Sequence, residues 1–395
     1  MPRSIFPCLS LAATALACAA FLAPSAHAAG KLKLGFLATL SGPNAVMGTQ
    51  VRDGFQLAVE EAGGKLGGLP TEVVTVDDQQ KPDVGRQAAS RLVESDRIDI
   101  LVGPLFSNVV NAVLPVMSQA KVPMIGAAGA PSSLAGAECS PYFFSSSWQG
   151  DTLAEAMGIA LQEKQVKRLY IMVPNFPGGK EVVAGIKRYF KGQIVGEVLT
   201  PLGQLDFAAE LAQLRAANPD AAFAFYPGGL GIQFVKQYVQ AGLKEKIPLY
   251  TAYTIDASTL PAIGDAALGV GTAEFWADSI DNAANRKFVE AFRRKYNYPP
   301  SSYAVQGYDA AKLLDSAVRK VAGKVEDRGA MLTALKAADF SSVRGAFKYN
   351  NNQFPIQDLY VGEIVKGGDG KPTMKLGRKV LTGHGDPYAS KCPLK

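Results

Sequence analysis

The sequence predicts an α/β fold in which two doubly wound lobes are each built on a parallel sheet. Three observations support this prediction. Apolar stretches with strand character alternate with stretches whose apolar residues recur at helical spacing, which is the pattern of βαβ units. This series starts at Lys31 and begins again after Trp148. The chain after residue 28 has roughly 367 residues, more than one hydrophobic core usually supports.

The individual elements follow from local patterns. Residues 98–102 form a continuous apolar run, as expected of a strand buried on both faces. Apolar residues recur at helical spacing through 51–62, and Gly63-Gly64 ends that helix. We therefore expect strands at 31–38, 71–76, 98–102, 123–125, 168–173, 194–199, 221–226 and 249–253, with helices through 51–62, 84–93, 109–117, 153–161, 182–190 and 207–214.

The loops that follow these strands are the expected ligand-binding positions. In doubly wound sheets, ligands bind outside the carboxyl ends of the strands. No long linker separates the two series, so a ligand is expected between the lobes. The loops selected in this way are 39–44, 77–82, 103–107, 126–130, 226–230 and 253–256.

Residues 1–28 have the organisation of a secretory signal peptide. Arg3 is their one charged residue, an apolar run extends from Leu9 to Leu22, and Ala26-His27-Ala28 forms a small-x-small cleavage site. Cleavage is expected after Ala28 or Ala29, with a lipoprotein signal at Cys18 as the competing interpretation. We therefore expect an exported, periplasmic protein.

The residues left after cleavage exclude several kinds of chemistry. The net charge falls from +6 to +5 because Arg3 is lost, and the basic residues are not gathered in blocks, so no nucleic-acid partner is expected. His384 is the remaining histidine, which argues against a zinc site and a Ser-His-Asp triad, and no cofactor or metal is predicted. Cys139 and Cys392 remain, and in an oxidising compartment they predict one disulfide.

Two neighbouring loops of small residues are candidates for binding a carboxylate. A strand ends at Gly103 and Ser107 opens the next helix, where free amide groups attract anions. The residues Ala127, Ala128 and Gly129 follow the next strand and would let a ligand approach the backbone. Ser107 could instead only cap its helix.

Aromatic residues at expected loop positions are candidates for lining a cleft. They are Trp148, Tyr226, Tyr253 and Trp276. Any one of them alone would be assigned to the core, but four near strand ends favour a cleft wall.

Four motifs occur in order along the chain: Leu40-Ser-Gly-Pro-Asn44, Asp77-Asp78, Val102-Gly-Pro-Leu-Phe-Ser107 and Gln306-Gly-Tyr-Asp-Ala310. Together they resemble the motifs of the leucine/isoleucine/valine-binding type of periplasmic solute receptor. The resemblance extends over the chain from Lys31. It implies a type I periplasmic binding fold, with two Rossmann-like lobes joined by a three-crossover hinge and crossings near Ser147, 272–276 and 349–352. The lobes would comprise residues 30–147 plus 275–349 and residues 148–274 plus 350–395.

The resemblance also implies a function and a site. Such proteins are the extracellular components of ATP-driven (ABC) importers, so the implied partners are a small carboxylate and a membrane permease, and the implied state is a monomer. The ligand carboxylate would be held by Ser107 and the 127–129 loop, with second-lobe contacts from Tyr226 and around Tyr253.

One departure from that family bears on the ligand. Amino-acid binders of this type place an acid near the position of Tyr253 to pair with the ligand ammonium, and here the nearest acid is Asp256. A buried ammonium without a carboxylate partner is costly. We therefore expect either an aromatic acid, such as a benzoate or phenylpropanoid, stacked on Trp148, Tyr226 and Tyr253, or a branched-chain amino acid paired with Asp256.

Two other functions remain open. The same two-lobed binder could signal to a membrane receptor instead of serving an importer. A secreted α/β hydrolase is the third alternative, disfavoured because no Gly-x-Ser-x-Gly motif occurs. No enzymatic activity is expected.

Overall fold

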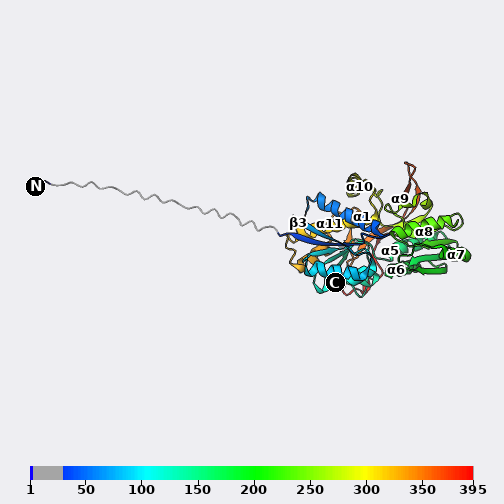
Figure 1. Ribbon diagram of the computed structural model, residues 1–395, viewed down its shortest axis with the longest axis horizontal. Helices are drawn as coiled ribbons and strands as arrows, with labels where there is room; N and C mark the ends of the chain where they lie inside the picture. Colours follow the sequence, from blue (N-terminus) through cyan, green and yellow to red (C-terminus); the bar gives the residue numbers. More distant parts are fainter. Residues whose placement is uncertain (3–29, 395) are drawn as a thin grey trace.

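The computed structural model describes residues 1–2 and 30–394 (Figure 1). Apart from its first two residues, the predicted signal peptide lies outside this described part. Within 30–394, no helix has the length and apolar character needed to cross a membrane. The residues form two lobes side by side, each with a central sheet covered by helices on both faces (Figure 1).

Lobe 1 is built on a six-stranded sheet with the order β2-β3-β1-β4-β5-β6. β1 pairs in parallel with both β3 and β4, so the strand order reverses at β1. The strands are β1 (Leu32–Ala38), β2 (Lys65–Leu66), β3 (Leu69–Asp77), β4 (Ile100–Val102), β5 (Met124–Gly126) and β6 (Phe143–Ser145), and the helices are α1 (Ala45–Glu61), α2 (Pro82–Glu94), α3 (Ser107–Gln119), α4 (Ser132–Ala135), α10 (Ala283–Tyr296), α11 (Ser302–Lys320) and α12 (Arg328–Ala337).

Lobe 2 is built on a nine-stranded sheet in which β8-β7-β9-β10-β11 repeats the doubly wound order. Here the order reverses at β7, which pairs in parallel with β8 and β9. The strands are β7 (Arg168–Pro174), β8 (Gln193–Thr200), β9 (Ala221–Ala224), β10 (Leu249–Ala252), β11 (Gly271–Glu274), β12 (Lys348–Tyr349), β13 (Pro355–Lys366), β14 (Pro372–Lys375) and β15 (Lys379–His384), and the helices are α5 (Thr152–Glu163), α6 (Pro177–Tyr189), α7 (Ala208–Ala217), α8 (Gly228–Gln240) and α9 (Leu260–Ile263).

The prediction of two doubly wound α/β lobes on parallel sheets is confirmed, and antiparallel strands that were not predicted extend both sheets. β13 runs antiparallel to β11, β12, β14 and β15, and β2 forms an antiparallel hairpin with β3. The pairs β2–β3, β12–β13 and β13–β14 are joined by short turns rather than helical crossovers, and a short turn can join only antiparallel strands. The 367–370 turn between β13 and β14 is of this kind.

Close helix packing in lobe 1 depends on two glycines. A Cβ on Gly54 of α1 would lie 1.9 Å from the backbone oxygen of Ala304 in α11. A Cβ on Gly307 of α11 would lie 1.9 Å from the backbone oxygen of Val51 in α1. The two backbones therefore touch at positions that only glycine can occupy, which explains the glycine in the Gln306–Ala310 motif.

The chain passes between the lobes after β6, after β11 and before β13. Arg344 joins these connections. Its guanidinium donates to the backbone oxygens of Ser146 and Ser147 at 2.8 and 3.0 Å and to the Asp309 carboxylate of α11 at 2.9 Å. It also donates to the Gln357 side chain at 3.1 Å. The exact lobe boundaries given above remain a prediction.

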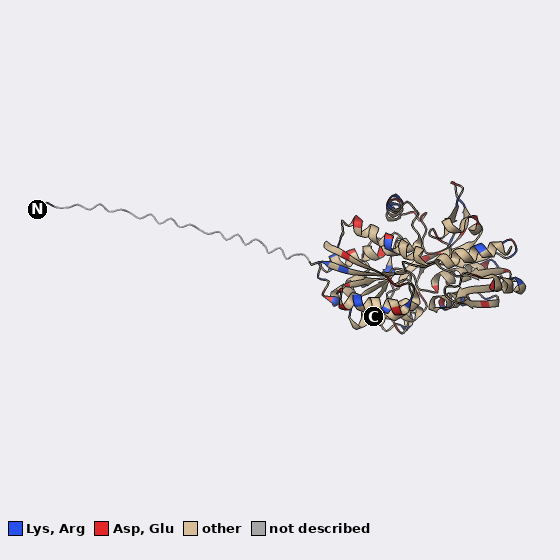
Figure 2. Ribbon diagram, in the orientation of Figure 1, with Lys and Arg blue, Asp and Glu red and all other residues tan. Residues whose placement is uncertain are grey.

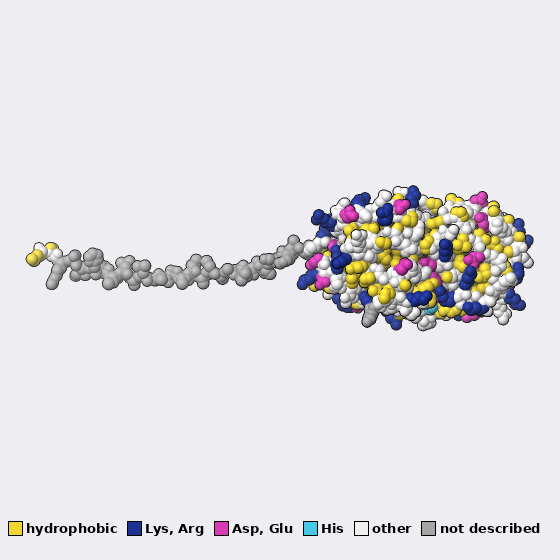
Figure 3. All heavy atoms as spheres, turned by 90° about the horizontal axis from the view of Figure 1, so that it is seen from below, with side chains coloured by type: hydrophobic (Ala, Val, Ile, Leu, Met, Phe, Trp, Pro, Cys, Tyr) yellow, Lys and Arg dark blue, Asp and Glu magenta, His cyan; other side chains and the backbone are white. Residues whose placement is uncertain are grey.

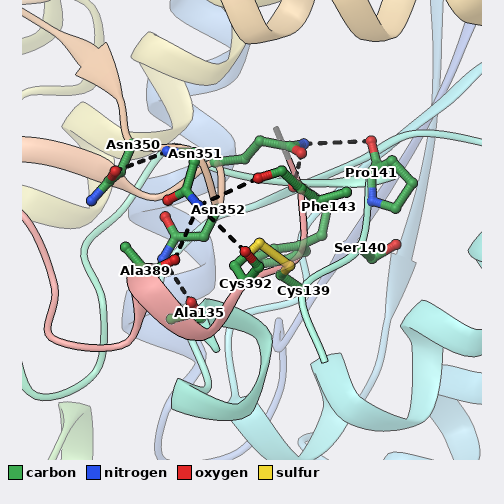
Figure 4. Close-up of a disulfide and its surroundings, with 12 residues drawn as sticks. Ala135, Cys139, Ser140, Pro141, Phe143, Asn350, Asn351, Asn352, Ala389 and Cys392 are labelled. Atoms are coloured by element: carbon green, nitrogen blue, oxygen red, sulfur yellow. Dashed lines mark hydrogen bonds between the residues drawn. A yellow bond between two sulfur atoms is a disulfide. The ribbon is translucent and has the colours of Figure 1, made fainter. Parts of the chain in front are cut away.

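The predicted disulfide is confirmed: Cys139 and Cys392 are bonded, with their Cα atoms 5.6 Å apart (Figure 4). Hydrogen bonds hold the same segments together. The Asn352 amide donates to the Ala135 oxygen at 2.7 Å, and the Asn351 amide donates to the Ala389 oxygen at 3.0 Å. The C-terminal tail is thus fixed beside lobe 1 after β15 has left the lobe 2 sheet.

Charged residues are scattered along the elements of both lobes (Figure 2). On the face shown in Figure 3, Lys and Arg are interspersed with Asp and Glu over both lobes. This distribution matches the absence of basic blocks in the sequence.

Candidate ligand-binding site

A small cavity of about 40 Å³ lies between the lobes, where the carboxyl ends of both sheets meet. Its walls come from the loops after β4, β5 and β6 of lobe 1 and after β7, β9 and β10 of lobe 2, from the N-terminal turns of α3 and α6, and from one residue each of α1 and α11. β1–β4 and β7–β9 are the places where the strand order reverses. The cavity therefore lies where doubly wound sheets bind ligands.

Ser107 lines this cavity as the first residue of α3. The N-cap of that helix is Phe106, and within the described residues no hydrogen bond engages the Ser107 hydroxyl. The expectation that Ser107 opens a helix is confirmed, whereas a capping role is not observed. The first amides of a helix lack intrahelical partners and carry a partial positive charge. The hydroxyl and these amides form one donor group at the cavity wall.

The small-residue loop after β5 contributes through alternate residues. Ala128, with φ at 75°, and Ala130 line the cavity. Ala127 is fully buried and is not among the lining residues. Gly129 packs against α3, because a Cβ there would lie 2.4 Å from Val110 Cγ2. Gly129 thus brings the loop close to α3.

Aromatic rings form most of the remaining wall. The Trp148 ring packs against Tyr253 and Tyr303, with centroids 4.7 and 5.9 Å apart, and Tyr253 packs against Phe225 at 5.5 Å. The Tyr253 hydroxyl donates to the Gly150 oxygen at 3.1 Å and accepts from the Leu153 amide at 3.2 Å. Its hydrogen-bonding capacity is therefore used within the protein, and Tyr253 offers the cavity mainly its ring.

Phe176 completes this wall between the lobes. Its ring lies 6.1 Å from Phe106 of lobe 1 and 6.0 Å from Phe225 of lobe 2. Sequence reasoning missed both Phe176 and Phe225, although Phe176 lies three residues after the end of a predicted strand and could have been found by that position.

Two expected second-lobe contacts lie elsewhere. Tyr226 is buried in the lobe 2 core, with its ring stacked on Phe234 at 4.7 Å and its hydroxyl bonded to Thr200. Asp256 is not among the lining residues, and its carboxylate accepts hydrogen bonds from the Ser258 amide and hydroxyl and from the Thr259 amide. Burial raises its pKa. Tyr226 and Asp256 are therefore turned away from the cavity.

Trp276, the fourth candidate aromatic, is also buried away from this cavity. Its indole N–H donates to the Asn285 side chain at 2.8 Å, and the residue lines a separate groove of about 720 Å³ beside the lobe boundary.

The cavity contains an acid that sequence reasoning missed. Glu181, in the second turn of α6, lines the wall, and its Oε1 accepts from the Ser132 amide and hydroxyl at 2.7 and 2.9 Å. Burial raises the pKa of Glu181 to about 7. Its sequence signal is weak, since one acid beside the apolar residues of an amphipathic helix is common. No basic side chain is among the described residues that line the cavity.

The lobes are in contact around this cavity. The Gly229 amide at the start of α8 donates to the Pro43 oxygen of lobe 1 at 3.1 Å, and Ser132 of lobe 1 bonds Glu181 of lobe 2. These bonds join loops that belong to different sheets. The arrangement is therefore a closed one, with a buried site between two bodies.

Comparison with known families agrees with this architecture. The family described as periplasmic binding protein matches residues 31–369. The chain belongs to the periplasmic binding protein family. This identity confirms the family resemblance and places the binding protein among periplasmic solute-binding proteins rather than enzymes.

Individual relatives cover nearly the whole chain. A Leu/Ile/Val-binding protein homolog from Brucella melitensis biotype 1 is 32% identical over 91% of this chain and 94% of its own length. A solute-binding protein of an ABC transporter from R. palustris, solved with benzoate, is 32% identical with a TM-score of 0.87, covering 92% of this chain and all (100%) of the other. A solute-binding protein from Rhodopseudomonas palustris BisB5, solved with 3,4-dihydroxybenzoic acid, is 29% identical with a TM-score of 0.85, covering 90% and 99%. The binding protein therefore has the fold of the solute-binding components of ABC transporters.

Proposed function

We propose that this protein binds a small carboxylate between its lobes and delivers it to the permease of an ABC importer. The observation that carries the proposal is the unused Ser107 hydroxyl at the start of α3, facing a cavity between the lobes. α3 has 13 residues, and its first amides favour a negative charge. Ala128 and Ala130 leave the backbone of the neighbouring loop open to the same anion.

We further propose that the ligand is an aromatic acid. The walls around Trp148, Phe176, Phe225 and Tyr253 suit a flat ring, because offset and edge-on ring contacts add to the free energy gained by burial. Asp256, the acid expected to pair with an ammonium, is turned into its own loop. The relatives solved with benzoate and 3,4-dihydroxybenzoate support this choice. The relatives named for leucine, isoleucine and valine support a branched-chain amino acid as the second candidate.

Transport also requires that the lobes open and close. A free volume of about 40 Å³ is far below the roughly 300 Å³ at the small end of ligand pockets, so a solute has to enter while the lobes are apart. Closure over the ligand then shifts the open–closed equilibrium, and the permease binds the closed form. We propose that the protein acts as a monomer, with no nucleic-acid partner and no cofactor. Genetic linkage to permease and ATPase genes would separate import from a sensory role.

The proposal is tested by calorimetric titration of the protein lacking residues 1–28. Benzoate, 4-hydroxybenzoate, 3,4-dihydroxybenzoate, L-leucine and L-isoleucine are the probes. We expect at least one of these carboxylates to bind, and we expect Ser107→Ala to weaken it by roughly ten- to a hundredfold, because a hydrogen bond to a charged group is lost.

Ser90→Ala on α2 is the matched control, since Ser90 is away from the cavity. It should leave the affinity unchanged. Binding that is equally strong in Ser107→Ala and the wild type would contradict the proposed site. Binding of none of the five probes would contradict the proposed function.

A further inference from the structure

The Glu181 carboxylate has one satisfied oxygen and one free oxygen. Oε1 accepts two hydrogen bonds from Ser132, which fixes the orientation of the group. Oε2 is buried and has no hydrogen-bond partner among the described residues. Buried acceptors are nearly always paired, and an unpaired carboxylate oxygen at a ligand cavity calls for a partner that the protein itself does not supply.

We infer that Glu181 is the second-lobe acceptor for a hydrogen-bond donor carried by the ligand, so that the solute is a carboxylate with a hydroxyl or amino group at a distance from its acid. This inference rests on the proposed function and narrows its ligand class. Ser107 and the α3 amides hold the acid, and Glu181 holds the donor.

The space around Glu181 is shaped for this role. A Cβ on Gly150 would lie 2.3 Å from Glu181 Oε2, so the glycine leaves room for the carboxylate. Three other buried acids of lobe 2 already have partners within the protein. Asp151 and Glu155 bind Arg188, and Asp256 binds its own loop. Glu181 is therefore the one carboxylate that lines the cavity among residues 30–394.

Charge also limits where the ligand acid can lie. With no basic residue in the described cavity wall, two carboxylates placed side by side would repel each other. The ligand acid is therefore held at the α3 end, where donors are available, and its other end faces Glu181. A phenolic hydroxyl on an aromatic acid and the ammonium of an amino acid both supply the required donor. The aromatic wall favours the phenol.

The test compares ligands with and without the donor on the wild type and Glu181→Gln. Glutamine keeps the shape of the side chain and its oxygen can still accept from Ser132, but its amide nitrogen then replaces Oε2, and that nitrogen cannot accept a hydrogen bond from a ligand donor. Titrations at pH 8, where Glu181 is mostly ionised, use benzoate, 3-hydroxybenzoate, 4-hydroxybenzoate, 3,4-dihydroxybenzoate and L-leucine.

We expect Glu181→Gln to weaken the preferred donor-bearing ligand by about tenfold or more while benzoate binds within about twofold of the wild type. Ser107→Ala should weaken benzoate and the donor-bearing ligand together. If Glu181→Gln loses affinity mainly for the hydroxybenzoates, the donor is a phenol. If it loses affinity mainly for L-leucine, the donor is an ammonium.

The inference would be overturned, with the proposed function left intact, if Glu181→Gln lost affinity equally for benzoate and for the donor-bearing ligands. It would also be overturned if the variant lost affinity for neither. Wild-type protein that binds benzoate but no donor-bearing acid would overturn it as well. Wild-type protein that binds none of the probes would overturn both.

Discussion

The carboxyl group of Glu181 is buried, and its burial makes the stability of the closed protein depend on pH. Burial is the main cause of the raised pKa of about 7, with a smaller contribution from the negative charge of Asp151. Ser132 opposes the rise by hydrogen bonding to the charged form. Because the folded pKa lies above the ordinary value, the protonated group stabilises the folded state, and this contribution is lost as pH rises from about 4.5 to about 7.

We therefore expect Glu181→Gln to gain stability relative to the wild type as the pH is raised. The two proteins should differ little at pH 5, and the variant should be more stable at pH 8 by up to about 3 kcal/mol, the free energy that corresponds to the change in pKa. Urea unfolding at both pH values measures the difference.

Glu245→Gln, at an exposed position, is the matched control and should track the wild type at both pH values. A Glu181→Gln difference that is the same at pH 5 and pH 8 would show that Glu181 does not titrate in this interval.

At the scale of elements, the hinge is held by one buried ion pair. Asp309 of α11 and Arg344 are both almost fully buried, and the same guanidinium also binds two backbone oxygens of the first crossing. Burial raises the pKa of Asp309, and Arg344 opposes that rise. The planar guanidinium of Arg344 binds α11 and the first crossing at the same time, and a lysine ammonium could not reproduce this set of contacts.

We expect Arg344→Met to destabilise the protein by about 3–5 kcal/mol, because it leaves the buried Asp309 carboxylate without its partner. Chemical unfolding measures the loss. Arg319→Met is the control, since Arg319 pairs with Asp315 on the surface of the same helix and should cost less than about 1 kcal/mol. Equal costs for the two variants would contradict the role assigned to Arg344.

At the scale of the whole molecule, one disulfide closes most of the chain into a loop. Cys139 and Cys392 are 253 residues apart in sequence, and between them lies all of lobe 2. Their bond holds the tail after β15 against lobe 1 (Figure 4). The bond therefore restricts the unfolded chain more than any local contact can.

We expect the Cys139→Ser/Cys392→Ser double variant of the protein lacking residues 1–28 to lose up to about 5 kcal/mol of unfolding free energy, from the chain-entropy estimate for a loop of this length. Removing the leader matters because Cys8 and Cys18 would add free thiols. Urea unfolding with and without dithiothreitol provides the measurement. The reductant should destabilise the wild type and leave the variant unchanged, and an equal response of both would contradict the assigned effect.

The sequence alone determined the features that depend on short-range pattern or on simple counting. Alternating periodicities located β1, β3, β4 and β7, the two cysteines left after cleavage specified the disulfide, and a serine after a strand marked the start of α3. The antiparallel strands β13 to β15 were missed because they follow the last βαβ unit and are joined by turns.

The tertiary structure decided which side chains meet in the cavity. Successive residues of an extended segment point to opposite sides, so Phe225 lines the cavity while Tyr226 lies in the core, and a shift of one residue in the expected position exchanges the two roles. Glu181 could not be found from its helix alone, because its importance comes from Ser132 and Gly150 on segments 49 and 31 positions away. The local sequence pattern determines which face of a helix or strand is buried, but only the packing of the two lobes determines which residues that face contacts.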